Sequence, residues 1–217
     1  MTLFSVPRLR GAFFFLLICI PALAVAHPHM QFTSTAEFVW DEKKLSGVYL
    51  EWVFDPYFSA DIIRGYDLNG DGLFNKAETK AVYEGAFTYL KNYNYFTFIS
   101  QKDRREMAKT VEQFSVSQKK GLLLYRFFID LSSWAPGTIR LAVYDYTFFC
   151  DVRYPDKNPV ALLYEKALVS PSWEIRENQD NPVYYDPFGS VDDTSVYYTW
   201  KKGLETYYPR EIWIHYE

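Results

Sequence analysis

Most of the chain consists of short stretches rich in aromatic and β-branched residues, bounded by Pro, Gly, Asp and Asn. This pattern is typical of β-strands. The stretches cover residues 30–40, 45–54, 95–100, 110–118, 122–131, 137–146 and 160–169. Between two of them, Lys119-Lys120-Gly121 predicts a hairpin turn. We expect a mainly β protein, built as an Ig-like antiparallel β-sandwich.

One segment breaks the strand pattern, because its apolar residues recur at helical spacing. Asp55-Pro56 predicts an N-cap followed by proline in the first helical turn. Apolar positions follow on both sides of a polar stretch: Phe58, Ile62, Ile63 and Tyr66 before it, and Val82, Ala86, Tyr89 and Leu90 after it. We therefore expect a helix-loop-helix insertion at about residues 55–92, between the second and third strands.

The loop of this insertion, residues 67–78, matches the twelve-residue calcium loop of an EF-hand. Calcium takes six to eight oxygen ligands. The expected ligands are the side chains of Asp67, Asn69, Asp71, Asn75 and Glu78 and the carbonyl of Leu73. Gly72 permits the sharp turn at the sixth position. An ordinary acidic turn uses the same residue types, but it would not also place Glu78 at the twelfth position between flanking helices.

Residues 1–26 have the pattern of a secretory signal peptide. Two arginines precede an apolar run, and Ala24-Val25-Ala26 provides a small-residue cleavage site. We expect cleavage before His27, because an uncleaved anchor would need about 20 apolar residues to span a bilayer. The mature protein is then expected in the periplasm, with no membrane insertion.

Charge and cysteine content narrow the class of protein further. The formal net charge is −4 without any block of Lys or Arg, which argues against nucleic acid as a partner. After cleavage Cys150 is the single remaining cysteine, so no intramolecular disulfide can form and calcium can provide a stabilising link instead. Cys150 lies in a strand-like run and is expected to be buried. Aromatic residues, 20% of the chain, are expected to fill the core.

Residues 171–217 form a Tyr-rich extension, which we expect to be particular to this chain or its subgroup. Residues 171–195 are rich in Asn, Asp, Pro, Gly and Tyr, which predicts a loop. The last residues, 209–217, alternate and predict a terminal strand. The expected organisation is a signal peptide at 1–26, a β-sandwich domain with the insertion at 27–170, and this extension.

The three histidines, His27, His29 and His215, lie near the ends of the mature protein. Once cleavage frees His27, its amino group and ring nitrogen can chelate a transition metal, and a second imidazole from His29 or His215 would complete a set suited to Cu²⁺. Three imidazoles could also bind Zn²⁺ tetrahedrally. In the alternative, the N-terminus is exposed and His215 packs beside Trp213. The first and last strands must meet in space for all three to form one site.

Motifs for catalysis without a metal are missing. The chain has no serine-hydrolase elbow and no phosphate-binding glycine loop, and a catalytic triad would have to recruit a terminal histidine. Asp192-Asp193 is a pair of adjacent carboxylates that a solvated turn explains. We therefore expect a non-enzymatic protein.

Several of these motifs together resemble the bacterial DUF1007 family. They are His27-Pro28-His29 after the signal peptide, Glu51-Trp52-Val53-Phe54-Asp55 before the insertion, the loop at 67–78, and Val143-Tyr144-Asp145 in a late strand. The family is described as a periplasmic component of an uncharacterised transport system, and its members are often associated with nickel, cobalt or zinc transporters. The resemblance implies a metal-handling accessory role, with Ni²⁺, Co²⁺ or Zn²⁺ as the metal and an inner-membrane metal transporter as the partner.

The residues support three functional hypotheses. The first is an exported, non-enzymatic metal-binding protein, stabilised by structural Ca²⁺, whose histidines hold a transition metal or pass it to a membrane transporter. The second is a copper-dependent oxidoreductase that uses N-terminal His27. The third is a calcium-dependent adhesion or sugar-binding module that uses the aromatic tail.

Overall fold

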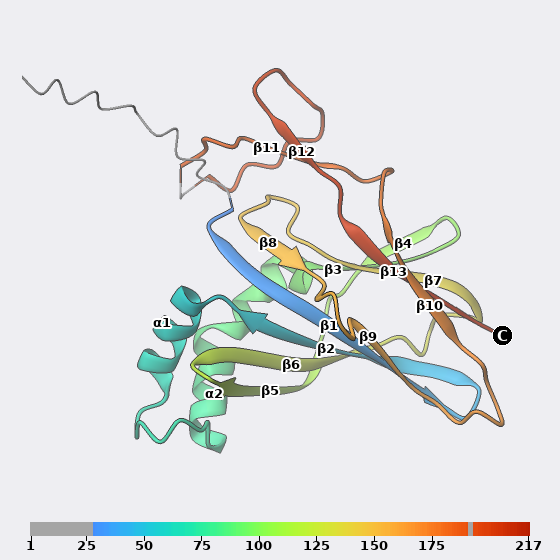
Figure 1. Cartoon of the computed structure of the whole chain (residues 1–217), viewed down its shortest axis with the longest axis horizontal. Coiled ribbons are helices and arrows are strands. Elements are labelled where there is room, and N and C mark those ends of the chain that lie inside the picture. Colours follow the sequence, from blue (N-terminus) through green and yellow to red (C-terminus); the bar gives the residue numbers. More distant parts are fainter. Residues whose placement is uncertain (1–27, 191–192) are drawn as a thin grey trace, which may run out of the picture.

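The computed structural model describes residues 28–190 and 193–217, so the predicted signal peptide, His27 and Asp192 lie outside the described residues. Two open β-sheets form most of the protein, and a pair of helices lies at one end of them (Figure 1). The predicted mainly β class is confirmed. Among the described residues, no helix is long and apolar enough to cross a membrane.

The first sheet has six strands in the order β5-β6-β2-β1-β8, and β9 also pairs with β1. Their bounds are β1 Met30–Asp41, β2 Lys44–Phe54, β5 Glu112–Lys119, β6 Leu122–Asp130, β8 Cys150–Arg153 and β9 Val160–Leu163. β1, β2, β5 and β6 are antiparallel neighbours, whereas β8 and β9 run parallel to β1. The purely antiparallel, Ig-like arrangement expected from the sequence is therefore wrong. Parallel pairing needs a long crossover, and the chain builds part of the second sheet between β1 and β8.

The second sheet has five antiparallel strands in the order β10-β13-β7-β3-β4. Their bounds are β3 Thr97–Gln101, β4 Arg104–Met107, β7 Gly137–Val143, β10 Ser172–Glu177 and β13 Arg210–Tyr216. The predicted terminal strand is β13, which lies between β10 and β7 in the interior of this sheet. The C-terminal segment is thus built into the second sheet.

The segment expected to be a loop, residues 171–195, contains β10 and also β11 (Val183–Tyr185), which pairs with β12 (Glu205–Tyr207). All residues of β10 except Ile175 are exposed, so no hydrophobic pattern marks this edge strand. Strands expected at 137–146 and 160–169 end earlier than predicted. The first ends before Asp145, because that carboxylate accepts hydrogen bonds from the N–H and hydroxyl of Thr147 (2.9 and 2.8 Å) and so stabilises a turn.

One hydrophobic cluster fills the space between the two sheets. Trp52 of β2 contacts Phe127 of β6, with ring centroids 4.8 Å apart, and Phe96 directly before β3, at 6.1 Å. Further along β1, Trp40 meets Tyr216 of β13 edge to face at 5.6 Å. The two sheets are therefore layers over a shared core, and aromatic rings contribute much of it, as expected.

The insertion between β2 and β3 consists of α1 (Pro56–Tyr66), α2 (Lys76–Gly85) and η1 (Phe87–Phe96), a segment of 3₁₀ turns. The predicted hairpin turn between β5 and β6 is confirmed, and Lys120 and Gly121 there have positive φ (+55° and +77°). α2 ends earlier than the helical spacing up to Leu90 predicts. The chain after it changes to the tighter 3₁₀ turns of η1, which break at Asn94 and Tyr95.

Candidate functional site

Helix α1, which leads into the loop at residues 67–78, is attached to the first sheet by polar contacts. One carboxylate oxygen of Asp55 accepts two backbone N–H bonds of the first turn of α1, at 2.8 and 3.0 Å, and the other accepts the N–H of Gln31 in β1 at 3.1 Å. Ser59 is fully buried, and its hydroxyl accepts the N–H of Leu123 in β6 at 2.9 Å. Asp55 is thus both the predicted N-cap and a link between α1 and β1.

Asn75 and Glu78 close the far end of the loop as a capping box at the start of α2. The side-chain oxygen of Asn75 accepts the N–H groups of Ala77 (2.8 Å) and Glu78 (3.1 Å). The Glu78 carboxylate accepts the N–H of Asn75 at 3.0 Å and, with its other oxygen, the N–H of Leu68 at 3.1 Å. Glu78 is buried and links the second residue of the loop to the last.

The middle of the loop is a series of tight turns held by its own side chains. Asn69 accepts the N–H of Asp71 at 3.0 Å, and Asp71 accepts the N–H of Leu73 at 2.8 Å. Gly70 and Gly72 have positive φ (+68° and +78°), a region that glycine enters without steric cost. The two glycines let the chain turn sharply enough for the polar side chains to fold back over it.

The two carboxylate oxygens of Asp67, the first residue of the loop, differ in their hydrogen bonding. Oδ2 accepts the N–H of Gly72 at 3.0 Å and the side-chain amide of Gln118 in β5 at 3.2 Å. Oδ1 is buried and has no hydrogen-bond partner. Gln118 cannot be recognised as part of the site from the sequence, because its contact with the loop depends on how β5 packs beside the insertion. Gln118 attaches the loop to the first sheet.

The structure keeps the six predicted ligands on one loop between two helices. Among the described residues, however, no three side chains of His, Cys, Asp or Glu gather closely enough to hold a metal ion. The loop side chains instead accept N–H bonds from the loop itself: Asp67, Asn69, Asp71, Asn75 and Glu78. Carboxylate, amide and carbonyl oxygens are the donors that Ca²⁺ prefers, and the unpaired buried Oδ1 of Asp67 is the atom that fits a cation.

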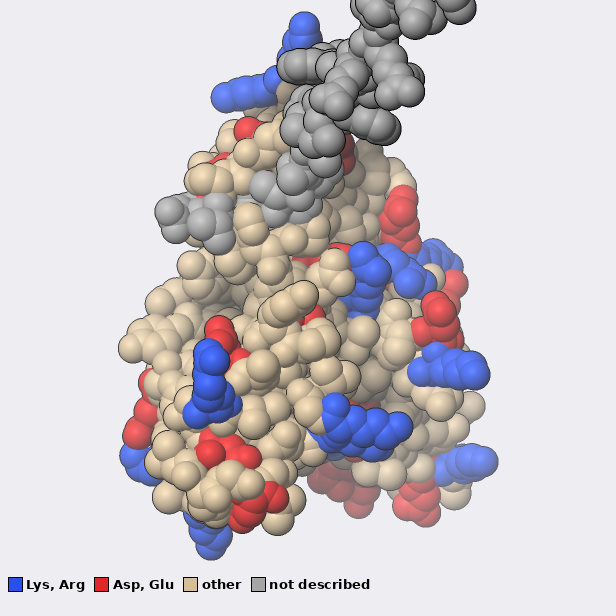
Figure 2. Space-filling view, turned by 60° about the vertical axis from the view of Figure 1, so that its left-hand side comes forward, with Lys and Arg blue, Asp and Glu red and all other residues tan. Residues whose placement is uncertain are grey.

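Basic and acidic residues are interspersed over the face drawn in Figure 2. At physiological ionic strength, exposed charges act over about 8 Å, so a mixed surface produces no strong field at longer range. Any attraction for a cation at residues 67–78 therefore comes from the carboxylates of the loop itself.

The described histidines lie apart, so His29 and His215 do not form the site of three imidazoles that the sequence left open. His29 lies at the start of β1, where its ring contacts Phe149 at 5.1 Å. His215 lies beside Tyr216, whose ring contacts Trp40 near the other end of β1. Trp40 stands ten positions after Met30, which is about 33 Å in an extended strand. His215 and Trp213 stand two positions apart on β13 and therefore lie on the same face of the strand. The ring of His215 also meets the hydroxyl of Thr138 at 3.1 Å.

Cys150 is buried, as expected, at the start of β8. Burial raises the pKa of its thiol well above the usual value, and the neighbouring Asp145 carboxylate raises it further. The thiolate is the form that acts as nucleophile or metal ligand. Cys150 is therefore a neutral core side chain at neutral pH.

The fold and the loop define a mainly β protein with a helix-loop-helix between β2 and β3. Residues 12–216 match the family described as "Protein of unknown function (DUF1007)", and the chain belongs to this family. The match runs through the C-terminal segment, so the expectation that this segment is particular to the chain is wrong. A relative from Spirochaeta aurantia, the uncharacterised 15.5 kDa protein in the trpE 3′ region, is 33% identical over 103 residues, 46% of this chain and 74% of that protein. No solved structure matches the chain.

Proposed function

We propose that residues 67–78 bind one Ca²⁺ as an EF-hand loop, and that this ion stabilises a β-sandwich protein with an accessory, non-enzymatic role. The observation that carries the proposal is the Asp67 carboxylate, which has one oxygen held by Gly72 and Gln118 and the other buried without a partner. An unpaired buried oxygen of this kind costs about 1–3 kcal/mol or more. A bound cation would remove that cost.

The residues of the loop match what the ion requires. Asp67, Asn69, Asp71 and Glu78 would supply side-chain oxygens, with Asn75 and the carbonyl of Leu73 completing the set. Calcium would supply charge here and no chemistry of its own. In the structure the carboxylates of Asp67 and Glu78 accept hydrogen bonds from backbone N–H groups. To bind the ion, these side chains would have to give up such hydrogen bonds and coordinate Ca²⁺ instead.

The position of the loop supports a stabilising role for the ion. α1 is attached to β1 and β6 through Asp55 and Ser59, and the loop is attached to β5 through Gln118. An ion bound between α1 and α2 would therefore link the two helices to each other, and α1 and the loop are already attached to three strands of the first sheet. Calcium then stabilises the insertion and the sheet together.

Titration of the full chain with CaCl₂ in a calorimeter tests this proposal. We expect a single site, with a Kd of about 10⁻⁴ M as in extracellular modules. Asp67→Asn keeps an acceptor for Gly72 and Gln118 but removes the charge, and it should abolish the binding heat. The matched control is Asp61→Asn, an exposed residue of α1 paired with Arg64. If both variants bind calcium like the unmodified protein, the loop is not the site.

We further propose that the protein is exported to the periplasm and holds a transition metal at its mature N-terminus for a membrane transporter. One observation favours this role. His29 is fixed at the start of β1, where its backbone N–H donates to the carbonyl of Phe149 at 2.9 Å, and its ring lies on the ring of Phe149. An imidazole with a fixed position can act as a ligand beside a free His27 two residues earlier, for Ni²⁺, Co²⁺, Zn²⁺ or Cu²⁺.

The exported protein, purified without an affinity tag and analysed by elemental mass spectrometry, tests this second role. We expect one transition metal per chain, lost in the His27→Ala/His29→Ala variant. His215→Ala is the matched control and should keep the metal, because His215 lies near the other end of β1. Copper together with ascorbate-driven peroxide formation would favour the oxidoreductase instead. A protein without any transition metal contradicts both roles and leaves the calcium proposal untouched.

A further inference from the structure

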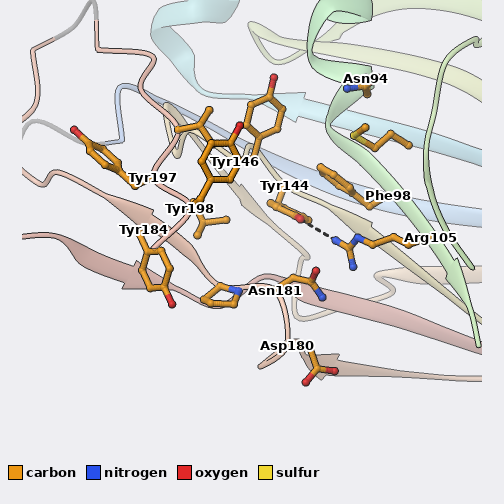
Figure 3. Close-up of a pocket in the computed structure, with 14 residues that line it drawn as sticks. Asn94, Phe98, Arg105, Tyr144, Tyr146, Asp180, Asn181, Tyr184, Tyr197 and Tyr198 are labelled. Carbon is orange, nitrogen blue, oxygen red and sulfur yellow. Dashed lines mark hydrogen bonds between the residues drawn. The ribbon is translucent and has the colours of Figure 1, made fainter. Parts of the chain in front are cut away.

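A cleft of about 830 Å³ lies on the second sheet, between β3, β4 and the segment that contains β11. Its floor includes Phe98, Arg105 and Tyr144, and its opposite wall includes Tyr184, Tyr197 and Tyr198. Figure 3 shows the tyrosines of the wall across from Phe98 and Arg105. The volume is within the range of about 300–1,000 Å³ that is usual for small-molecule sites.

The wall is held over the sheet by a second hydrophobic cluster, separate from the main core. It joins Phe98, Tyr144 and Phe148 to Val183 of β11. Phe148 also contacts the rings of Tyr185 and Tyr207, on β11 and β12, at 4.2 and 4.7 Å. The cleft is therefore built by the fold, since both its floor and its wall rest on buried aromatic contacts.

Arg105 is fixed in the floor by three different groups. Its guanidinium donates to the hydroxyl of Tyr144 at 2.9 Å, lies over the ring of Phe98 at 5.2 Å, and pairs with the buried Glu211 carboxylate at 3.9 Å. Phe98 and Tyr144 are themselves stacked, with centroids 4.3 Å apart. A guanidinium has five N–H donors, so one that is oriented in this way still has donors to offer a ligand.

The groups beside Arg105 hold its guanidinium in a fixed position in the cleft. Glu211 is buried and also accepts a hydrogen bond from the side chain of Asn178 at 2.5 Å, which fixes the carboxylate on one side of the guanidinium. Burial raises the pKa of Tyr144, so its hydroxyl stays neutral and accepts from Arg105 at physiological pH. A ligand carboxylate can bind the open side of the guanidinium with two parallel hydrogen bonds.

The remaining lining selects among anionic ligands. Tyrosine rings offer flat apolar faces with polar tips, and Asn94, Asn181 and Asp180 add amide and carboxylate groups that hydrogen-bond to hydroxyls. A small inorganic anion would use Arg105 but would leave the tyrosine rings without a partner. A neutral sugar would use the rings but not the charge. A sugar ring that carries a carboxylate uses all three kinds of group.

We propose that this cleft binds a carboxylate-bearing saccharide, with the carboxylate on Arg105, the C–H faces of the sugar on the tyrosine rings, and its hydroxyls on Asn94, Asn181 and Asp180. The proposal is independent of calcium, because the loop at 67–78 contacts the first sheet and the cleft lies on the second.

The test titrates the full chain with digalacturonate, and with galactobiose as its neutral counterpart, by calorimetry and saturation-transfer NMR at constant calcium. We expect digalacturonate to bind at least tenfold more tightly than galactobiose. Arg105→Gln should weaken digalacturonate binding by about 10- to 100-fold, because a hydrogen-bonded charge is lost. Arg104→Gln is the matched control. Arg104 is the neighbouring residue of β4, lies over Trp134 on the other face and pairs with Glu106, so this variant should bind normally.

A second variant keeps the test valid if Arg105→Gln fails to fold, as its melting temperature would reveal. Tyr198→Ala removes a ring that is 87% exposed, so the fold is retained, and it should weaken both sugars. Equal binding of the two sugars, or normal binding by Arg105→Gln, overturns the carboxylate contact. Absence of binding by either sugar overturns the proposal. It is also overturned when inorganic phosphate or the tripeptide Gly-Gly-Tyr displaces digalacturonate at equal or lower concentration.

Discussion

In 10 mM CaCl₂ the full chain should melt about 5–11 °C higher than in a calcium chelator. A ligand at 100 times its Kd stabilises the folded state by about 2.7 kcal/mol, which is the case here if Kd is about 10⁻⁴ M. Each kcal/mol shifts the melting temperature of a protein of this size by about 2–4 °C. Differential scanning calorimetry in calcium and in chelator measures the shift directly.

Two variants locate the origin of this shift. Asp67→Asn and Glu78→Gln each remove one of the charged groups that would bind the ion, and both should melt at the same temperature in calcium and in chelator. Asp61→Asn should keep the full shift, because Asp61 lies outside the loop on the exposed face of α1. Melting curves of the unmodified protein that coincide in calcium and chelator would show that the ion does not stabilise this fold.

The parts of the structure that the sequence predicts well depend on neighbouring residues. The cap at Asp55 and the capping box of Asn75 and Glu78 are short-range patterns, and they place α1 and α2 on either side of the loop. The long strands β1, β2 and β6 are equally clear, because they are rich in apolar and aromatic residues, and every second side chain faces the core over most of their length. The spacing of the loop residues, too, is a property of twelve consecutive positions.

The parts of the structure that the sequence does not predict depend on contacts between residues that are far apart in the sequence. All residues of β4 and nearly all of β10 are exposed, so these edge strands have no apolar periodicity, and only their pairing with β3 and β13 defines them. The parallel pairing of β8 and β9 with β1 follows from the path of the chain through the second sheet. The contacts that build the two candidate sites cannot be predicted from the sequence for the same reason. Gln118 reaches Asp67 across 51 positions of sequence, and Arg105 reaches Tyr144 across 39.

Trp52→Ala should lower the free energy of unfolding more than any of the other substitutions. Trp52 is fully buried near the C-terminal end of β2. Its ring contacts Phe32 at 4.6 Å and Phe127 at 4.8 Å, and also Phe96, directly before β3 of the second sheet. Removing a buried tryptophan costs about 3–5 kcal/mol. Trp52→Phe should cost much less, because it keeps an aromatic ring and removes an indole N–H that is buried without a partner.

Denaturant unfolding in the presence of chelator measures these differences without a contribution from calcium. Trp173→Ala on the exposed edge strand β10 is the matched control, and a substitution on such a surface usually changes stability by less than about 0.5 kcal/mol. If Trp52→Ala loses no more stability than Trp173→Ala, the two sheets do not unfold as one layered core around this residue.

Combining the core variant with calcium tests whether the insertion and the sheets unfold together. Trp52 and the loop share no contact partner among the described contacts, so their effects on the free energy of unfolding should add within about 0.5 kcal/mol. Trp52→Ala should then keep the full calcium stabilisation in a single transition at lower temperature. Two separate transitions, with calcium shifting just one of them, would show that α1 and α2 unfold independently of the sheets, despite the links through Asp55, Ser59 and Gln118.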